Sequence, residues 1–433
     1  MKTLLSIALA VLCIQAVFGA DPHEHSKVVC YWNSTAYERQ GPAKFQLDDV
    51  RAALSLCTHL VYGYAHINSD FEIVPGSPSL DTGSGYSYYR LATQLKRSFP
   101  DLKIYLSVGG NSDPYDEEHK YLVLTETSEG RTKFINSVNR LLNDYDFDGI
   151  DLAWQFPTVK PKKQRSTLGS LWHGLKKKLG YGKFHDEKEQ EHRDGFTILV
   201  RDLKTQLRPR FKALTVTVLP HVNASVYYDV RLLAPNIEAV NLFAFDQKTP
   251  ERSVKEADFP APIYSSYGRV VDDSVDAATR YWLENGTPGS KIIVGIPTFA
   301  RTWKLTADSQ ISGVPPIVAD GPGAPGPHTN EPGLLSYAEI CAKLTEHAAG
   351  RLRRVGDPSK KYGSYAYQSY NPDTGAEGLW AGYEDPDTAG NKATFVKSKG
   401  LGGVAIVDLS LDDFRGVCIG DKYPIIRGAK YKL

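Results

Sequence analysis

The sequence predicts an α/β protein built as a (β/α)8 TIM barrel with a small inserted α+β domain. Two observations support this fold class. Short apolar runs rich in β-branched residues recur eight times along the 433 residues, and stretches with helical periodicity lie between them. A Pro/Gly-rich interruption late in the chain is longer than the loops that join strands to helices in such barrels, which indicates an inserted unit.

The predicted strands and helices alternate in the order that a (β/α)8 barrel requires. Strands are expected near 27–32, 59–65, 103–109, 149–155, 213–219, 239–245, 292–297 and 402–408. Helices are expected between them, among others over 86–98, 131–144, 195–208 and 273–285. The chemistry of such barrels lies at the C-terminal ends of the strands, so Gln155, which ends the fourth strand, is expected at the mouth.

The domain organisation follows from the interruption. Residues 306–379 contain the segment SGVPPIVADGPGAPGPH, a helical pattern around 335–347 and the tyrosine-rich segment KKYGSYAYQSYNP. We assign 306–379 to the inserted α+β domain, and 21–305 together with 380–433 to the barrel.

The N-terminus has the pattern of a secretory signal peptide over residues 1–20. Lys2 precedes an apolar run from Leu4 to Phe18, and the small residues Gly19 and Ala20 follow as a cleavage site. No later apolar stretch is long enough to span a bilayer. The mature protein is therefore expected to be secreted, soluble and extracellular.

Cysteine usage agrees with an oxidising compartment. Cys13 leaves with the signal peptide, so Cys30, Cys57, Cys341 and Cys418 remain. Four cysteines allow three connectivities, and the sequence alone does not choose between them. No CxxC pair or close Cys/His spacing is present, so no metal site is predicted.

Composition and short motifs indicate which classes of partner, cofactor and modification to expect. The chain is 41% hydrophobic and 23% charged with a formal net charge of +1, which does not favour nucleic acid or a membrane surface. No Gly-rich phosphate loop is present, so no cofactor is expected. Three sequons, at Asn33, Asn223 and Asn285, are candidate sites for N-linked glycans. With no oligomerisation segment, a monomer is the default expectation.

A basic insertion, residues 158–194, follows the fourth predicted strand. Eight Lys or Arg residues and no acidic residue lie between Lys160 and Lys183, namely Lys160, Lys162, Lys163, Arg165, Lys176, Lys177, Lys178 and Lys183. One interpretation is a solvated loop. The other is a site for an acidic partner or a polyanion such as a heparin-like glycosaminoglycan.

The segment FDGIDLAWQFP, residues 147–157, contains the most informative row of side chains. Alternation in a strand puts Asp151, Ala153 and Gln155 on one face. The row begins with a carboxylate and ends with an alanine and an amide, so it is either an acid site or the remnant of one.

This segment resembles the DGxDxDxE signature of family 18 glycoside hydrolases, the chitinases. Asp148 and Asp151 match the signature, whereas Ala153 stands in place of its third aspartate and Gln155 in place of its catalytic glutamate. Further segments resemble other strand motifs of the family: SVGG, NLFAFD, GIPTFARTW and GLGGVAIVDLSLDDF. The resemblance implies this barrel with its small domain, and the disulfide pairs Cys30–Cys57 and Cys341–Cys418.

The departures from the family pattern affect the chemistry. Chitinases of this family cleave with help from the 2-acetamido group of the substrate, while the glutamate protonates the leaving oxygen. The amide of Gln155 cannot deliver a proton, and losing a general acid removes about 10²- to 10⁴-fold in rate. Ala153 and Phe245 stand where an aspartate and a tyrosine would contact the acetamide. An active chitinase is therefore the least supported hypothesis.

A sugar-binding groove remains an alternative. Asn111 and Val407 stand where the resemblance implies stacking tryptophans, which weakens that alternative. The remaining candidates for carbohydrate contact are Tyr31, Trp32, Tyr64, Gln155, Asp246, Arg301, Trp303 and Trp380. Packing explains the five aromatic residues at least as well, and Gln155 could still bond a sugar. Asp246 and Arg301 either line the mouth or pair with each other. Asp148 and Asp151 are interpreted as structural remnants.

A family 18 barrel with glutamine for the acid and a basic insertion just after it resembles the imaginal disc growth factors of insects. These are secreted, non-catalytic relatives of chitinases. The resemblance implies an extracellular protein that promotes cell growth, proliferation or motility through an unknown cell-surface receptor. The alternative function is a lectin for chitin oligosaccharides.

Overall fold

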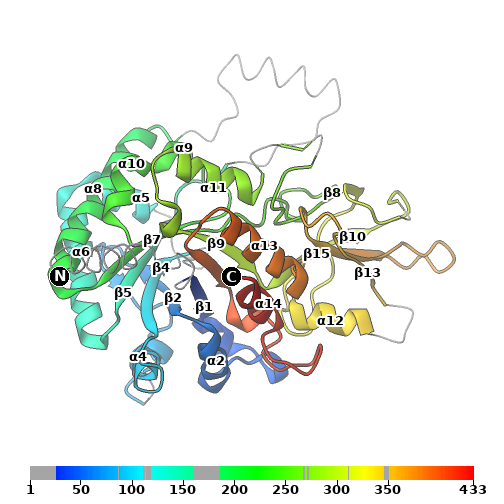
Figure 1. Ribbon diagram of the computed structural model, residues 1–433, viewed down its shortest axis with the longest axis horizontal. Coiled ribbons are helices and arrows are strands. Elements are labelled where there is room, and N and C mark those ends of the chain that lie inside the picture. Colours follow the sequence, from blue (N-terminus) through cyan, green and yellow to red (C-terminus); the bar gives the residue numbers. More distant parts are fainter. Residues whose placement is uncertain are drawn as a thin grey trace, which may run out of the picture.

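A computed structural model describes residues 26–85, 87–110, 113, 119–159, 186–266, 269–270, 273–310, 312–345 and 351–433 (Figure 1). The predicted signal peptide, residues 1–20, lies outside these ranges. So does the cationic part of the predicted basic insertion, from Lys160 to Lys183, and so does Asn111.

Eight parallel strands form a closed barrel, which confirms the predicted fold class. In chain order they are β1 (Lys27–Asn33), β2 (His59–Ile67), β4 (Lys103–Gly109), β5 (Gly149–Ala153), β6 (Ala213–Val218), β7 (Ala239–Leu242), β9 (Ile292–Pro297) and β16 (Gly403–Val407). The order around the sheet is β1-β16-β9-β7-β6-β5-β4-β2, and the pairing of β1 with β2 closes it.

Helices surround the barrel (Figure 1). The α-helices are α2 (Leu47–Ala53), α3 (Pro78–Asp81), α4 (Tyr88–Gln94), α5 (Lys120–Glu126), α6 (Ser128–Tyr145), α8 (Glu189–Leu207), α9 (Ala224–Tyr227), α10 (Val230–Leu233), α11 (Val275–Glu284), α12 (Tyr337–Thr345), α13 (Pro386–Ser398) and α14 (Pro424–Lys432). Short 3₁₀ helices are η1 (Ser34–Glu38), η2 (Gly41–Ala43), η3 (Leu54–Leu56), η4 (Leu95–Arg97), η6 (Arg208–Arg210), η7 (Ala234–Asn236), η8 (Gly289–Lys291) and η9 (Leu409–Leu411).

Local sequence explains the two longest helices. α6 begins before the predicted position, because the Thr127 side chain accepts a hydrogen bond from the Gly130 amide and caps the first turn. α8 buries apolar side chains at helical spacing, namely Phe196, Leu199, Val200, Leu203 and Leu207, all fully buried. Both helices therefore cover the outside of the sheet with one apolar face.

A second, antiparallel sheet lies beside the barrel (Figure 1). Its strand order is β12 (Leu334–Ser336), β10 (Phe299–Leu305), β15 (Gly378–Tyr383), β14 (Ser364–Gln368) and β13 (Arg353–Val355). The short strands β8 (Glu256–Ala257) and β11 (Ile317–Val318) pair with each other, and β3 (Ile73–Val74) pairs antiparallel with the end of β2. β10 ends at the first position at which we divided the chain and β15 spans the second, although both belong to this one sheet, so that division stays a prediction.

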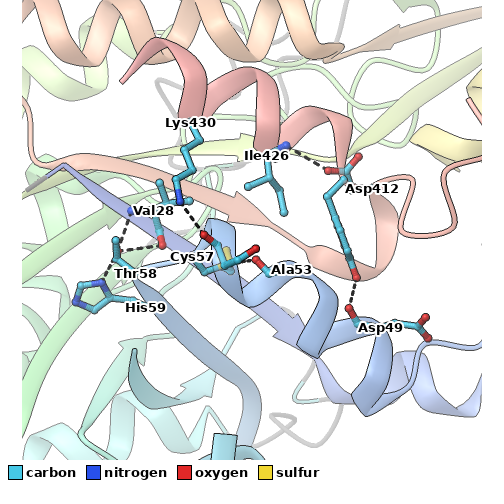
Figure 2. Close-up of a disulfide and its surroundings, with 12 residues drawn as sticks. Val28, Asp49, Ala53, Cys57, Thr58, His59, Asp412, Ile426 and Lys430 are labelled. Atoms are coloured by element: carbon cyan, nitrogen blue, oxygen red, sulfur yellow. Dashed lines mark hydrogen bonds between the residues drawn. A yellow bond between two sulfur atoms is a disulfide. The ribbon is translucent and has the colours of Figure 1, made fainter. Parts of the chain in front are cut away.

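The structure contains two disulfides, and they are the pairs that the family resemblance implies. Cys30 of β1 is bonded to Cys57, just before β2, with their Cα atoms 6.0 Å apart. Cys341 of α12 is bonded to Cys418, with a Cα–Cα distance of 5.4 Å. Figure 2 shows Cys57 next to the last helix, where Lys430 of α14 donates to the Ser55 carbonyl at 2.9 Å.

Candidate functional site

The inner row of β5 begins with Asp151, whose carboxylate is fully buried inside the barrel. Its oxygens accept hydrogen bonds from Tyr31, Ser107, Thr215, Thr217 and Asn241. Those from Ser107 and Thr215 are each 2.7 Å long. Burial raises the pKa of Asp151, and these hydrogen bonds oppose the rise. With its oxygens engaged by the protein, Asp151 is a structural anchor and is not open to a substrate.

Two tyrosines lie close to this carboxylate. Tyr31 is buried, and its hydroxyl lies 2.7 Å from that of Thr217. Tyr64 is half-buried and packs against Gly110, where an added Cβ would lie 2.7 Å from the Tyr64 ring. Burial, followed by the nearby Asp151 charge, raises the pKa of both phenols, so both stay neutral hydrogen-bonding groups.

Further along the row, Ala153 is fully buried and Gln155 is half-buried. The Nε2 atom of Gln155 donates to the Gly110 carbonyl at 2.6 Å. Gly110 and its neighbour Gly109 have positive φ angles of 65° and 96°, and a Cβ on Gly109 would lie 2.3 Å from the Ala153 carbonyl oxygen. The two glycines therefore let the end of β4 approach β5 closely enough for this bond.

An aromatic layer fills the barrel beside this row. The rings of Phe243 and Phe245 stack at 5.1 Å, and Phe243 meets the edge of Tyr31 at 5.1 Å. Phe245 also contacts Phe299 at 5.9 Å. All four rings are buried. Phe245 therefore contributes only a hydrocarbon ring to the barrel interior, without the hydroxyl that a tyrosine would have.

Asp246 and Arg301 pair with each other at the edge of the site. The Nε and Nη2 atoms of Arg301 each donate to one carboxylate oxygen of Asp246 at 2.7 Å. The Arg301 guanidinium also lies 4.9 Å from the centre of the Phe299 ring. The pKa of Arg301 is raised: burial opposes the rise, but the Asp246 charge outweighs it. Of the two predicted alternatives for these residues, mutual pairing is the one observed.

Three predicted stacking aromatics are packing residues. Trp303 and Trp380 are fully buried, meet edge to face at 5.5 Å, and donate to the carbonyls of Ser253 and Gly313. Trp32 is buried between the rings of Tyr62 and Tyr88. All three rings are thus packed in the interior of this structure, and their role as carbohydrate contacts stays a prediction.

Asp148 lies away from the row, at the N-terminal end of β5. Its carboxylate accepts from the Ile104 amide at 2.8 Å and pairs with Lys96 at 3.2 Å. The interpretation of Asp148 as a structural residue therefore has a physical basis, since it joins β5 to β4.

The sequence analysis missed His221, just after β6. Its backbone carbonyl accepts from Val159 at 2.9 Å, at the start of the predicted basic insertion. Burial first, and then the charge of Arg252, lowers its pKa to about 4, so the ring is neutral. Its Nε2 atom has no hydrogen-bond partner among the described residues. No spacing in the sequence singles out this histidine, because the turn that positions it follows from the barrel.

The sequons lie at turns. Asn223 is exposed and caps α9, and its side-chain oxygen accepts from the Ser225 amide. Asn33 caps η1 in the same way. Asn285 donates to the Tyr281 carbonyl at 2.8 Å, and Thr287 of the same sequon is buried. Use of these sequons stays a prediction.

Within the described ranges, no group of three or more His, Cys, Asp or Glu side chains is placed to hold a metal ion. Across the same residues, no helix is long and apolar enough to cross a membrane.

The protein-family model of glycosyl hydrolases family 18 matches residues 27–412. The chain belongs to this family. It is 49% identical to chitinase-like protein Idgf4 of Glossina morsitans morsitans, over 99% of this chain and 98% of the relative. It is 44% identical to imaginal disk growth factor 6 of Drosophila melanogaster, over 100% of this chain and 99% of the relative. Within family 18 it is thus an imaginal disc growth factor type of chitinase-like protein.

Solved structures of the family share the fold. Catalytic domain 2 of the Ostrinia furnacalis Group II chitinase is 25% identical with a TM-score of 0.77, covering 95% of this chain and 97% of that chain. Human YKL-39, described as a pseudo-chitinase with retained chitooligosaccharide binding properties, is 25% identical with a TM-score of 0.74, covering 94% and 99%.

Proposed function

We propose that this family 18 protein is secreted, does not cleave glycosidic bonds, and promotes cell growth, proliferation or motility through a cell-surface receptor. The observation that supports the absence of cleavage is the row Asp151–Ala153–Gln155. An amide that donates to the Gly110 carbonyl stands where a general acid must release a proton. A buried methyl group stands beside it, and Asp151 is held by the protein.

The signalling part of the proposal is supported by the relatives. Chains 44–49% identical over nearly their whole length carry the names imaginal disk growth factor and chitinase-like protein Idgf. Secretion is supported by the apolar N-terminal run and by the two disulfides. No contact of the structure identifies the receptor, so the partner enters the proposal only as a cell-surface protein.

The test has two arms that use the purified mature protein. Turnover of a fluorogenic chitotrioside is expected to stay at the level of the buffer blank. Proliferation of cultured insect cells is expected to rise with added protein, and heat-denatured protein is the control. Turnover that Asp151→Asn abolishes would overturn the non-catalytic part. Cell numbers equal to those with denatured protein would overturn the signalling part.

A second candidate function is binding of chitin oligosaccharides without cleavage. It is favoured by the half-buried Gln155 and Tyr64 at the mouth, and by the retained chitooligosaccharide binding of YKL-39. Calorimetric titration with chitohexaose tests it. Binding heat that disappears in Gln155→Leu supports a lectin groove. No heat at about millimolar ligand excludes a groove that binds chitohexaose more tightly than about millimolar.

A further inference from the structure

The N-terminal opening of the barrel, at the far end from the candidate site, carries basic residues on neighbouring strands. Lys27, His59 and Lys103 are the first residues of β1, β2 and β4. β2 pairs with both other strands, and His59 lies directly opposite Lys103 in the register. The three basic groups are thus brought together by barrel closure, although they are far apart in the sequence.

These side chains are expected to face the barrel axis. The residues two positions further along the same strands belong to the apolar cluster inside the barrel: Val29, Val61 and Tyr105. Side chains alternate along a strand, so the first residues share that inward face. For His59 a contact agrees, because its ring meets the edge of Tyr105 at 5.5 Å. Its Nδ1 atom forms a hydrogen bond with the Thr58 hydroxyl (Figure 2), at 2.8 Å.

Two acidic groups at this end have other partners. Asp148 pairs with Lys96 at 3.2 Å, and Glu238 pairs with Lys204. Glu238 also accepts from the Leu214 amide at 2.6 Å. Within the part of the chain that the structure describes, the ion pairs include neither Lys27 nor Lys103, so these two charges remain for solvent or for a ligand.

Neighbouring cations add to the effect of burial on the pKa of two of these groups. Burial, and then the charge of Lys291, lowers the pKa of Lys27. Lys291 precedes β9 and donates to the carbonyls of Ala234 and Ile237. Burial, and then the charges of Lys27 and Lys103, lowers the pKa of His59 to about 4 against the opposing charge of Asp148, so without a ligand the ring is neutral near pH 7. A bound anion would relieve this repulsion.

We propose that the N-terminal opening of the barrel, formed by Lys27, His59 and Lys103 with Lys291 beside them, binds a sulfated polysaccharide. Neighbouring strands are about 4.8 Å apart, so the strands of Lys27 and Lys103, with β2 between them, are roughly 10 Å apart, and Lys27 also begins two residues before the level of His59. Cations at this separation suit successive anions on a chain better than one ion. Lysine ammonium groups act as point charges and bind sulfate groups in varied orientations. A sulfated chain is the polyanion that an extracellular protein meets. This surface is separate from the predicted site between Lys160 and Lys183, and the inference shares only secretion with the proposed function.

Titration with heparin at physiological ionic strength tests the proposal. Lys27→Gln/Lys103→Gln is expected to weaken binding by about tenfold and to make the affinity less dependent on salt. The matched control is Lys397→Gln/Lys422→Gln, which removes two exposed lysines elsewhere and is expected to keep the parent affinity. A variant with the eight cations from Lys160 to Lys183 changed to glutamine should also keep binding to the opening. Binding lost only in that last variant would overturn the proposal.

The imidazole of His59 gives a readout that does not depend on a variant. In the parent protein, saturating heparin is expected to raise the pKa of His59 in an NMR titration, because an anion stabilises the imidazolium. An unchanged His59 titration in a heparin-bound protein would overturn the proposal. A DNA oligonucleotide of equal charge serves as the third arm. Equal or tighter binding of DNA, with the same loss in Lys27→Gln/Lys103→Gln, would contradict a sulfated polysaccharide as the partner.

Discussion

Gln155 donates its side-chain amide to the carbonyl oxygen of Gly110 at 2.6 Å and so links the C-terminal ends of β5 and β4. The bond uses one N–H of the amide to hold the wall of the barrel. A catalytic acid in this position would instead keep its proton for the substrate. The residue that marks the loss of the acid has thus acquired a structural contact of its own.

This contact predicts the result of restoring the acid. Gln155→Glu is expected to give no measurable hydrolysis of a fluorogenic chito-oligosaccharide, because Ala153 and Phe245 still lack polar groups. At neutral pH the new carboxylate faces the Gly110 carbonyl, which should cost about 1–3 kcal/mol in the free energy of unfolding. In acid the protonated carboxyl can donate, so this cost should shrink as the pH falls. Turnover by the single variant would show that the other losses are not decisive.

The pair of Arg301 and Asp246 predicts an asymmetric response to mutation. Arg301→Met leaves a largely buried carboxylate without its partner and should cost about 3–5 kcal/mol, measured by urea unfolding. Adding Asp246→Asn removes that charge, so Asp246→Asn/Arg301→Met should regain much of the loss. A double variant as unstable as Arg301→Met would mean that packing on Phe299, and not the charge, is responsible.

Asp412 predicts a pH dependence of stability. It is fully buried and accepts from the Ile426 amide at the start of α14 (Figure 2). Burial raises its pKa from 3.8 to about 7. Its contribution to stability is therefore complete below the unfolded pKa and is lost as the pH rises through about 7, by up to about 1.4 kcal/mol per pH unit.

Asp412→Asn should make the stability curve flatter over this range, as measured by chemical unfolding between about pH 5 and pH 8. A smaller slope should remain, because burial also raises the pKa of Asp81 to about 6. The companion variant Asp412→Asn/Asp81→Asn should be flatter again. Identical slopes in the parent and Asp412→Asn would contradict the assignment.

Trp380 predicts loss of stability and no direct effect on ligand binding. Trp380→Ala should cost about 3–5 kcal/mol, because the ring is fully buried against Trp303 and Tyr365. Trp380→Phe keeps most of the packing and is expected to lose less. If chitohexaose binds the parent, Trp380→Phe should bind it equally well in calorimetry, and a selective loss of binding would restore Trp380 as a contact.

The sequence alone predicted the barrel because its strands are short and apolar, and each is followed by a helical pattern. It also located the row of β5, since alternation along one strand is a local property. It did not predict the antiparallel pairing of β10 with β15, which joins segments separated by the whole insert. Nor did it separate packing aromatics from exposed ones, because Trp303 and Trp380 look the same in either role until their neighbours are known.

The pairing of β1 with β16 has a consequence for biosynthesis. β1 is among the first elements to leave the ribosome, and its partner β16 is among the last. Until then the nascent chain carries an open parallel sheet with an unpaired edge, a form prone to aggregate. The Cys30–Cys57 bond can form early, since both cysteines emerge together, but it secures only the β2 side of β1. The other edge of β1 has no strand partner until residue 407 has been translated.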